Sequence, residues 1–498
     1  MHLSKSQYCS AIQCPKMLWM KKNKPDVFDD SWLNQAVFDT GNEVGDKAKS
    51  LFGEYTEVPF TDFPKMIDTT KKLMEDGVPN ICEASFSYDG LFCRVDILRN
   101  LGNHEVEVYE VKSSTDRIRE IYFHDISFQC YILHKLGYEV RRACLVHINN
   151  KYVRQGELDL QQFFEFEDMT EKINTSYDDV AANLSRFEEY LKQTKEPKDD
   201  IGVHCHEPYS CGFYTYCTRN FPKPNFFDIP GFRIATKYEL YHAGLVSYED
   251  LMESDKLSEK QRWQVIHSLK PNVVRIKKPE IKRFLDGLYY PLYFLDFETF
   301  NPAVPIYDKT RPYQQIVFQY SLHFIEKEKG ELHHKEFLAT PEADPRQKIA
   351  ERLLSDIPDN ACILAYNMTF EQTCIKGLAK LFPEWFTQLM HIHDRIQDLM
   401  YPFGREDYYT SDMQGSYSIK HVLPALFPND PELNYHNLEG VQNGSDASAA
   451  FLQMVTHPLE DWTERRKQLL KYCGLDTFAM VKIWQHLCEV VNQWDEEE

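Results

Sequence analysis

Ten residues, Pro291-Leu-Tyr-Phe-Leu-Asp-Phe-Glu-Thr-Phe300, constrain the fold of this chain more than any other stretch. The apolar, aromatic run Tyr293–Leu295 predicts a buried strand, which ends at two carboxylates, Asp296 and Glu298. Side chains two positions apart in a strand point to the same face of the sheet. Two carboxylates on one face repel each other unless a cation lies between them, and a divalent, oxygen-preferring metal suits that place.

Further acids for such a site come from later segments. Ile363–Asn367 predicts another short strand, and Glu371 follows it after Met-Thr-Phe. Tyr472 and Asp476 lie four residues apart in a helical pattern, so a phenol and a carboxylate share one helix face. Asp398 is one more acid, which we interpret as a structural residue at the end of a strand.

The order of these motifs resembles the DEDD family of RNase H-like 3′-to-5′ exonucleases, over roughly residues 290–490. The family's first motif, Asp-x-Glu, matches the strand-end pair, and its third, Tyr-x-x-x-Asp, matches Tyr472 and Asp476. Its second motif, Asn-x-x-Phe-Asp, matches Asn367 to Phe370 but carries Glu371 where the family has Asp.

This resemblance implies a two-metal site for phosphodiester hydrolysis, with Mg²⁺ or Mn²⁺ as the ions and Tyr472 orienting the attacking water. The implied metal ligands, which also count as catalytic residues, are Asp296, Glu298, Glu371 and Asp476.

The N-terminal part of the chain predicts a second site. A hairpin turn at Asp89-Gly90 precedes the alternating strand His104–Lys112. Glu110 and Lys112 share one face of that strand, and Asp96 lies on the hairpin strand before it. Two carboxylates can hold a metal there, and the lysine can stabilise charge on a phosphate.

This Asp…Glu-x-Lys layout resembles the PD-(D/E)XK nuclease core in its RecB-like branch. The resemblance implies Asp96 and Glu110 as metal ligands and adds Lys112 and Gln129 as catalytic residues. Glu83 and Arg94 occupy positions where that branch often carries polar site residues.

The chain departs from the RecB-like pattern at one position. Many members of that branch carry a metal-binding histidine on an early helix. Here Gly41-Asn-Glu-Val-Gly-Asp46 has no histidine. We expect Glu43, Asp46 or Glu83 to lie near the site in its place.

Four of the 13 cysteines form a pattern that suggests a cofactor. Three lie within thirteen residues and one far upstream, and thiolates select iron–sulfur clusters or zinc. The layout resembles the cluster-binding RecB-like nucleases, which include CRISPR-associated spacer-acquisition nucleases. The resemblance implies a 4Fe–4S cluster on Cys14, Cys205, Cys211 and Cys217. Zn²⁺, with His204 or His206 as a ligand, and unligated core cysteines are the alternatives.

The predicted fold class is α/β (α+β), in three parts. Residues 1–220 form a restriction-endonuclease-like core with the cysteines, and residues 150–200 within them are expected to be helical. Residues 221–288 form a helical, basic linker in which phosphate binding and a solvated helix face are both open readings. Residues 289–498 form an RNase H-like mixed sheet. The order of the two main parts resembles bacterial proteins that fuse these nuclease types.

The net charge and the hydropathy of the chain limit the kinds of partner and the cellular location that we expect. A net charge of −21 argues against a protein that coats DNA non-specifically, but it is compatible with acidic metal sites. We expect a cytoplasmic protein without a membrane span, because no apolar run approaches 18 residues and the N-terminus lacks a signal-peptide pattern.

The predicted function is a metal-dependent nuclease that acts on DNA in preference to RNA. The rivals are a nucleic-acid-binding scaffold with degenerate sites, and a nuclease with one working site beside a structural N-terminal domain.

Overall fold

The computed structural model describes residues 2–31, 35–115, 118–252, 254–270 and 274–492. It divides the chain into two compact units. Unit 1 comprises Met1–Asn220 and Pro302–Gln314, and unit 2 comprises Phe221–Asn301 and Gln315–Glu498. Both units combine helices with a sheet, which confirms the α/β class. The segment predicted as a separate linker, 221–288, clusters with unit 2, and the loop 302–314 clusters with unit 1.

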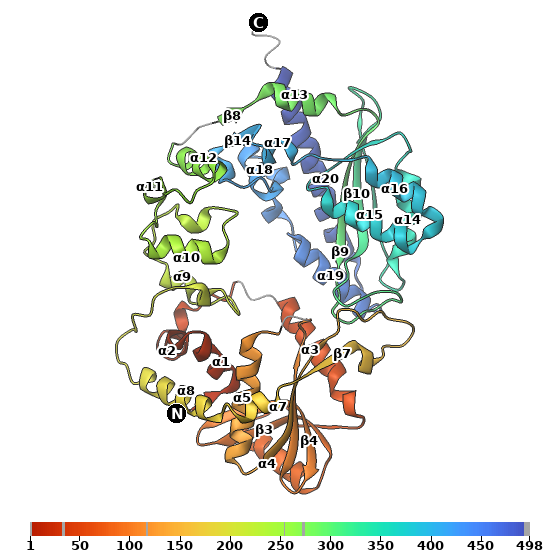
Figure 1. Cartoon of the computed structure of the whole chain (residues 1–498). Helices are drawn as coiled ribbons and strands as arrows, with labels where there is room; N and C mark the ends of the chain where they lie inside the picture. Colours follow the sequence, from red (N-terminus) through yellow and green to blue (C-terminus); the bar gives the residue numbers. More distant parts are fainter. Residues whose placement is uncertain (1, 32–34, 116–117, 253, 271–273, 493–498) are drawn as a thin grey trace. The chain divides into compact units, whose positions relative to one another are not determined.

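Unit 1 is built on a seven-stranded sheet in the order β2-β3-β4-β5-β6-β7, with β1 paired to β4 (Figure 1). The β3–β4 hairpin turns at Asp89 and Gly90, both with positive φ, as the sequence predicts. β5 and β6 are parallel and are joined through α5. The strands are β1 (Leu3–Ser4), β2 (Thr56–Glu57), β3 (Asn80–Tyr88), β4 (Leu91–Gly102), β5 (Glu105–Lys112), β6 (Glu139–Ile148) and β7 (Phe164–Asp168).

Helices cover both faces of this sheet. One core lies between the strands and α1, α5 and α8, and the other includes apolar residues of α3. The helices are α1 (Lys5–Gln13), α2 (Pro15–Asn23), α3 (Gln35–Lys49), α4 (Phe63–Glu75), α5 (Glu120–Lys135), α6 (Leu160–Phe163), α7 (Thr170–Asn174), α8 (Tyr177–Leu191) and α9 (Tyr214–Cys217).

The prediction that residues 150–200 are helical is wrong in several parts, because only α6, α7 and α8 are helical there and residues 151–159 and 192–200 contain no helix. Residues 164–168 form β7, which pairs antiparallel with the end of β6. Phe164 is buried against the second core and Phe166 packs there too, so this short segment follows a two-residue period. Pairing with β6 therefore overrides the helical character of the surrounding sequence.

Unit 2 contains a five-stranded sheet in the order β11-β10-β9-β12-β13. β9, β10 and β11 are antiparallel neighbours, whereas β12 runs parallel to both β9 and β13. The strands are β9 (Leu292–Phe300), β10 (Ile316–Ile325), β11 (Leu332–Leu338), β12 (Cys362–Ala365) and β13 (Ile396–Asp398). A separate pair consists of β8 (Val274–Ile276) and β14 (Tyr408–Thr410).

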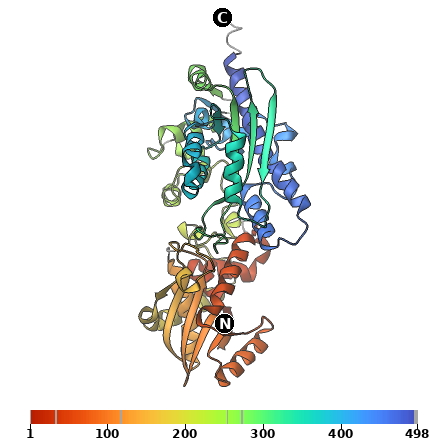
Figure 2. The same ribbon diagram turned by 90° about the vertical axis from the view of Figure 1, so that its right-hand side faces the viewer.

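The two faces of β9 pack against different helices, and Figure 2 shows the long helix α20, in blue, running alongside the strands. Tyr293, Leu295 and Phe297 share a core with α14, α15 and α16, while Leu292 and Phe294 share one with α20. The helices are α10 (Ile234–His242), α11 (Tyr248–Leu251), α12 (Glu259–Ser268), α13 (Lys278–Asp286), α14 (Pro345–Asp356), α15 (Thr369–Leu381), α16 (Phe386–Asp394), α17 (Tyr401–Gly404), α18 (Ile419–Leu426), α19 (Gly444–Thr456) and α20 (Thr463–Asn492).

This alternation positions the two acids of the first motif. The strand does not end at Asp296 and Glu298, as the sequence suggested, but continues to Phe300 because β10 remains paired with it. The even-numbered side chains of β9 lie on the α20 face. Both carboxylates are therefore held between the sheet and that helix.

Among the described residues, none of the helices combines the length and apolar character that crossing a bilayer requires.

Candidate functional sites

Four acids of unit 2 converge where β9 faces α20. Ligand atoms of Asp296, Glu298 and Cys473 all lie within 4.8 Å of one another, which is the spacing of a possible metal site. The Asp476 carboxylate raises the pKa of Asp296, of Glu298 and of Glu371 on α15. The structure thus brings together the acids of all three predicted motifs.

Glu298 and Glu371 are buried, Asp296 and Asp476 are half-buried, and the described residues place no paired cation among them. Glu371 is only 2% exposed, and its Oε2 atom has no hydrogen-bond partner in the described chain. Burial raises the pKa of Glu371 to about 8, with Asp398 and Asp476 adding to the shift. Burial first, and then the neighbouring acids, raise the pKa of Asp296 and Glu298 as well. Within the described residues, no lysine or arginine forms an ion pair with any of the four acids.

Two phenols meet the carboxylate of Asp476. Tyr435 Oη donates to Asp476 Oδ1 at 2.5 Å, and the Tyr472 phenol hydrogen-bonds the same side chain. Burial raises the pKa of Asp476 to about 6, and the two hydrogen bonds oppose this shift. Tyr472 lies on the site as predicted. Tyr435 carries no sequence signal, because it lies 41 residues before its partner.

A thiol also contacts the first motif. Cys473 Sγ lies 3.8 Å from Asp296 Oδ2 and 3.9 Å from its main-chain oxygen. Cys473 directly follows Tyr472 in the sequence, and this adjacency to a motif residue is the signal that could have identified it. Burial, followed by Asp296, Glu298 and Asp476, raises the pKa of this thiol well above its usual range. The group is therefore a neutral S–H donor beside the carboxylates.

A cavity of about 650 Å³ is lined by Tyr435, the hydrogen-bond partner of Asp476, whereas none of the four acids lines it. Its size is within the range of small-molecule binding pockets. Tyr435 connects it to Asp476, and Lys420 lowers the pKa of both Glu298 and Asp476 from its wall. Amide side chains form much of the remaining lining, namely Asn429, Asn434, Asn437, Gln442 and Asn443.

Asp398 has the structural role that we expected. Its Oδ1 atom accepts hydrogen bonds from the main-chain nitrogens of Asn367 and Met400, both at 2.9 Å. Asn367 has a positive φ of 67°, so the carboxylate stabilises the turn that leads from β12 into α15. Asp398 thereby positions the helix that carries Glu371.

The predicted residues of unit 1 also come together. Lys112 Nζ lies 2.6 Å from Glu110 Oε1, and Gln129 Nε2 donates to Glu110 Oε2 at 2.7 Å. Asp125, one turn before Gln129 on α5, accepts from both Lys112 (2.8 Å) and Gln129 (3.0 Å). Asp96 Oδ2 accepts from the main-chain nitrogen of Val111 at 2.8 Å.

Sequence reasoning missed a second ammonium in this cluster. Lys5 Nζ lies 3.0 Å from both carboxylate oxygens of Glu110, 3.6 Å from Asp125 Oδ1 and 3.8 Å from Asp96 Oδ1. It lies in the first turn of α1, far from the other members in sequence. The residues present therefore do not fit a divalent ion while Lys5 stays in place, because its ammonium lies among the three carboxylates and would repel a second cation there.

The expected substitutes for the missing histidine are largely engaged elsewhere. Glu83 forms an ion pair with Arg94 at 3.1 Å, and Asp46 pairs with Lys49 at 2.7 Å on the exposed side of α3. The Asp46 side chain is 69% exposed, whereas Glu83, whose pKa burial raises, is close enough to the cluster for the Lys5 ammonium to oppose that shift. Burial raises the pKa of Glu43, but the structure gives it no contact with the cluster.

The four predicted cysteines are neighbours at the start and end of unit 1. Burial raises the pKa of Cys211 to about 11, and Cys14, Cys205 and Cys217 each add to the shift. Cys14 lies between α1 and α2, and Cys211 donates its main-chain N–H to Cys205 at 2.9 Å. In the described chain these thiols do not meet the 4.8 Å spacing that the unit 2 group meets.

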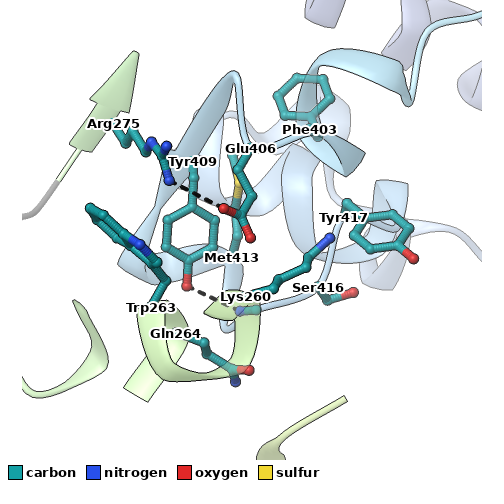
Figure 3. Close-up of a pocket in the computed structure, with 11 residues that line it drawn as sticks. Lys260, Trp263, Gln264, Arg275, Phe403, Glu406, Tyr409, Met413, Ser416 and Tyr417 are labelled. Carbon is teal, nitrogen blue, oxygen red and sulfur yellow. Dashed lines mark hydrogen bonds and ion pairs between the residues drawn. The ribbon is translucent and has the colours of Figure 1, made fainter. Parts of the chain in front are cut away.

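The basic segment before β9 is largely neutralised within unit 2. Figure 3 shows Arg275 between the Trp263 ring and the Glu406 carboxylate, and its NH1 atom lies 3.2 Å from Glu406 Oε2. Lys277 pairs with Asp407 at 3.1 Å, and Lys260 lies over the Tyr417 ring. The cavity among these side chains has a volume of about 20 Å³, which admits about one water molecule. These contacts favour a structural role over phosphate binding.

Comparisons with known proteins match parts of the chain. The family described as "Domain of unknown function (DUF2779)" matches residues 293–418, which include the first two acidic motifs but neither Tyr472 nor Asp476. "Uncharacterized protein MG366 homolog" of Mycoplasma pneumoniae is 27% identical over 206 residues, 38% of this chain and 31% of that protein. "Uncharacterized protein UU173" of Ureaplasma parvum is 23% identical over 267 residues, 49% of this chain and 38% of that protein. The chain thus spans about a third of the length of these relatives.

Proposed function

We propose that this protein is a metal-dependent nuclease whose working site is the unit 2 cluster, acting as a 3′-to-5′ exonuclease on DNA in preference to RNA. The observation that carries the proposal is the group of four acids, two of them buried and two half-buried, that forms no ion pair in the described chain. Such a group is unstable unless its protons are retained or a cation binds. The sheet order β11-β10-β9-β12-β13 supports the resemblance to RNase H-like enzymes.

The residues of the cluster have distinct roles in this proposal. Bound Mg²⁺ or Mn²⁺ would supply an activated water and neutralise charge on a phosphodiester. Asp296, Glu298, Glu371 and Asp476 would hold these ions. Tyr472 would orient the attacking water, and Tyr435 fixes the rotamer of Asp476 through its hydrogen bond. The adjoining cavity, with Lys420 on its wall, is the place for the strand end.

The same proposal gives unit 1 a cofactor and a supporting role. We propose a 4Fe–4S cluster on Cys14, Cys205, Cys211 and Cys217 that joins the two ends of the unit. A cytoplasmic location fits reduced thiols of this kind. No catalytic step is assigned to Asp96, Glu110, Lys112 and Gln129, because Lys5 neutralises the place that a divalent ion would take.

The test is an assay on end-labelled single- and double-stranded DNA and RNA, with Mg²⁺, with Mn²⁺ and with EDTA. We expect metal-dependent shortening from the 3′ end, abolished by the double change Asp296→Ala with Asp476→Ala and retained in Lys112→Ala. Tyr472→Phe should keep Mn²⁺ binding and lower kcat by about 10²-fold or more, because a positioned proton-transfer group is lost. If the double variant still degrades 3′ ends and Lys112→Ala does not, the working site is in unit 1 and the proposal is wrong.

A second candidate, a nucleic-acid-binding scaffold, would be favoured if strands bind without cleavage under every metal condition. Comparing the Asp296→Ala variant with the unsubstituted protein distinguishes a nuclease from a scaffold. If the protein is a nuclease, the variant should bind labelled strands without cleaving them, and the unsubstituted protein should cleave the same strands.

A further inference from the structure

The charged cluster of unit 1 differs from the unit 2 site in containing cations that pair with its acids. It contains three carboxylates, on Asp96, Glu110 and Asp125, and two ammonium groups, on Lys5 and Lys112. Its formal charge is therefore −1, whereas the four acids of unit 2 have no paired cation in the described chain. Glu110 is only 1% exposed, so its charge needs a close partner.

Lys5 is held in this position by its neighbours along the chain. The two residues before it form β1, which pairs in parallel with β4, and Ser4 caps α1 by accepting from the main-chain nitrogen of Gln7. Three residues later, Tyr8 is fully buried and its ring stacks on Phe128 of α5 at 4.7 Å. The first turn of α1 is thus fixed against both the sheet and α5, and the Lys5 side chain is directed at the cluster.

The position of the Lys5 ammonium coincides with that of a bridging ion. It contacts both oxygens of Glu110 at 3.0 Å and lies within 4 Å of the other two carboxylates. A divalent cation would need the same oxygens at about 2.0–2.6 Å. An ion in that position would lie beside the Lys5 ammonium, and the two positive charges would repel each other. Burial disfavours the ammonium, but Asp125, Glu110 and Asp96 outweigh it and keep the pKa of Lys5 above its ordinary value.

We propose that Lys5 is the resident cation of the unit 1 cluster, so that a divalent ion binds among Asp96, Glu110 and Asp125 only when the Lys5 side chain is displaced or removed. The cluster is then a site that an element of the same chain keeps filled. This inference concerns unit 1 alone and is independent of the nuclease activity proposed for unit 2.

The experiment measures Mn²⁺ binding by electron paramagnetic resonance and calorimetry. All variants carry Asp296→Asn and Asp476→Asn, which remove two of the four metal ligands proposed for unit 2. In this background Lys5→Met is compared with Lys22→Met, which changes an exposed lysine on α2. We expect Lys5→Met to gain one bound Mn²⁺ per chain, with affinity at least about tenfold above the parent, because no ammonium has to be displaced.

Thermal unfolding supplies a second readout in the same variants. Without metal, Lys5→Met should unfold at a lower temperature than Lys22→Met, and Mn²⁺ should restore much of the difference. Adding Glu110→Gln should abolish the gained binding. If the parent already binds one Mn²⁺ that Glu110→Gln removes and Lys5→Met does not strengthen, the inference is overturned.

A measurement on the unsubstituted chain covers the case in which Lys5→Met does not fold. Acetylation by an N-hydroxysuccinimide ester, mapped by mass spectrometry, should modify Lys22 readily and Lys5 at least about tenfold more slowly, since a half-buried ammonium paired with carboxylates is not nucleophilic. Modification of Lys5 at the rate of Lys22 would overturn the inference. Mn²⁺ bound in unit 1 while Lys5 stays protected would also overturn it, because the two cations would then coexist.

Discussion

Glu371 is the residue at which the unit 2 site departs from the motif it resembles. Its side chain is one methylene longer than aspartate, and it reaches the cluster from α15, which begins after the turn held by Asp398. The Oε2 atom is buried without a hydrogen-bond partner in the described chain. A buried carboxylate oxygen in that state is available to a metal ion.

Shortening this side chain tests the assignment. We expect Glu371→Asp to retain or raise exonuclease activity with Mn²⁺, because it restores the residue of the matching motif. Glu371→Gln, a matched control of equal length, should lower kcat/KM by about 10²-fold, because it removes the charge. Steady-state kinetics on a labelled single strand would measure both. Loss of cleavage in Glu371→Asp would indicate a site adapted to the longer side chain.

The acids also predict how the metal-free protein responds to pH. Folding raises the pKa of Glu371 from 4.5 to about 8 and that of Asp476 from 3.8 to about 6. The folded chain therefore binds more protons than the unfolded chain between these values, and its stability falls as pH rises. In EDTA, we expect the free energy of unfolding to fall by roughly 5 kcal/mol between pH 5 and pH 8.5, most of it from Glu371.

Denaturant titrations at several pH values would measure this fall. Saturating Mn²⁺ should remove most of it, because the cation stabilises the ionised carboxylates. In Glu371→Gln the fall should be smaller, because the contribution of that carboxyl group is lost. A metal-free protein whose stability rises with pH would contradict the burial of these acids.

At the scale of elements, the cysteines connect the two ends of unit 1. Cys14 ends α1 and caps α2, while Cys205, Cys211 and Cys217 lie on the segment that closes the unit. Cys14 and Cys211 pack against a small core of Met17, Trp19, Met20 and Phe213. A cofactor on these thiols would join segments about 190 residues apart, which Gln13 also joins by donating to His204 O at 2.7 Å.

Removal of one thiol tests this connection. We expect anaerobically purified protein to be brown and to contain iron and acid-labile sulfide. Cys14→Ala should lose the colour and lower the unfolding temperature of unit 1 by roughly 5–10 °C, because the tie between α1 and the closing segment is lost. Cys9→Ala, at the intermediate-exposure cysteine five residues earlier, serves as the control. Colourless protein with one zinc per chain would refute the cluster.

At the scale of the whole chain, unit 1 is not a continuous segment. Ala303 and Val304 belong to its second core, and Arg154 NH1 donates to Pro305 O at 2.6 Å. Asp308 accepts from the main-chain nitrogen of Gly156, and Tyr313 hydrogen-bonds the main-chain oxygen of Ser113, just after β5. The loop between β9 and β10 is thus a structural part of unit 1.

This arrangement predicts the behaviour of a fragment. Residues 1–220 alone should be less stable than unit 1 in the full chain by roughly 2–4 kcal/mol, from two lost apolar contacts and several hydrogen bonds. Denaturant titration monitored at unit 1 would measure the difference. A peptide of residues 302–314 added in excess should recover part of it, whereas a scrambled peptide should not. Equal stability of the fragment and the full chain would contradict the assignment of the loop.

The sequence by itself determined the features that repeat over a few residues. The two-residue period of β9 placed Asp296 and Glu298 on one face, and the four-residue spacing in α20 placed Tyr472 with Asp476. The Asp89-Gly90 turn likewise indicated the hairpin before β5. These features follow from backbone geometry that neighbouring residues impose on one another, so they are visible without a partner segment.

Only the tertiary structure decided which distant groups complete each site. Lys5 reaches Glu110 across 105 positions, and Tyr435 reaches Asp476 across 41, with no spacing that links them. The same holds for β7 and for the loop 302–314, whose places depend on pairing and burial against other segments. Charge balance in a buried cluster depends on which side chains meet there, and this depends on the packing of the whole unit.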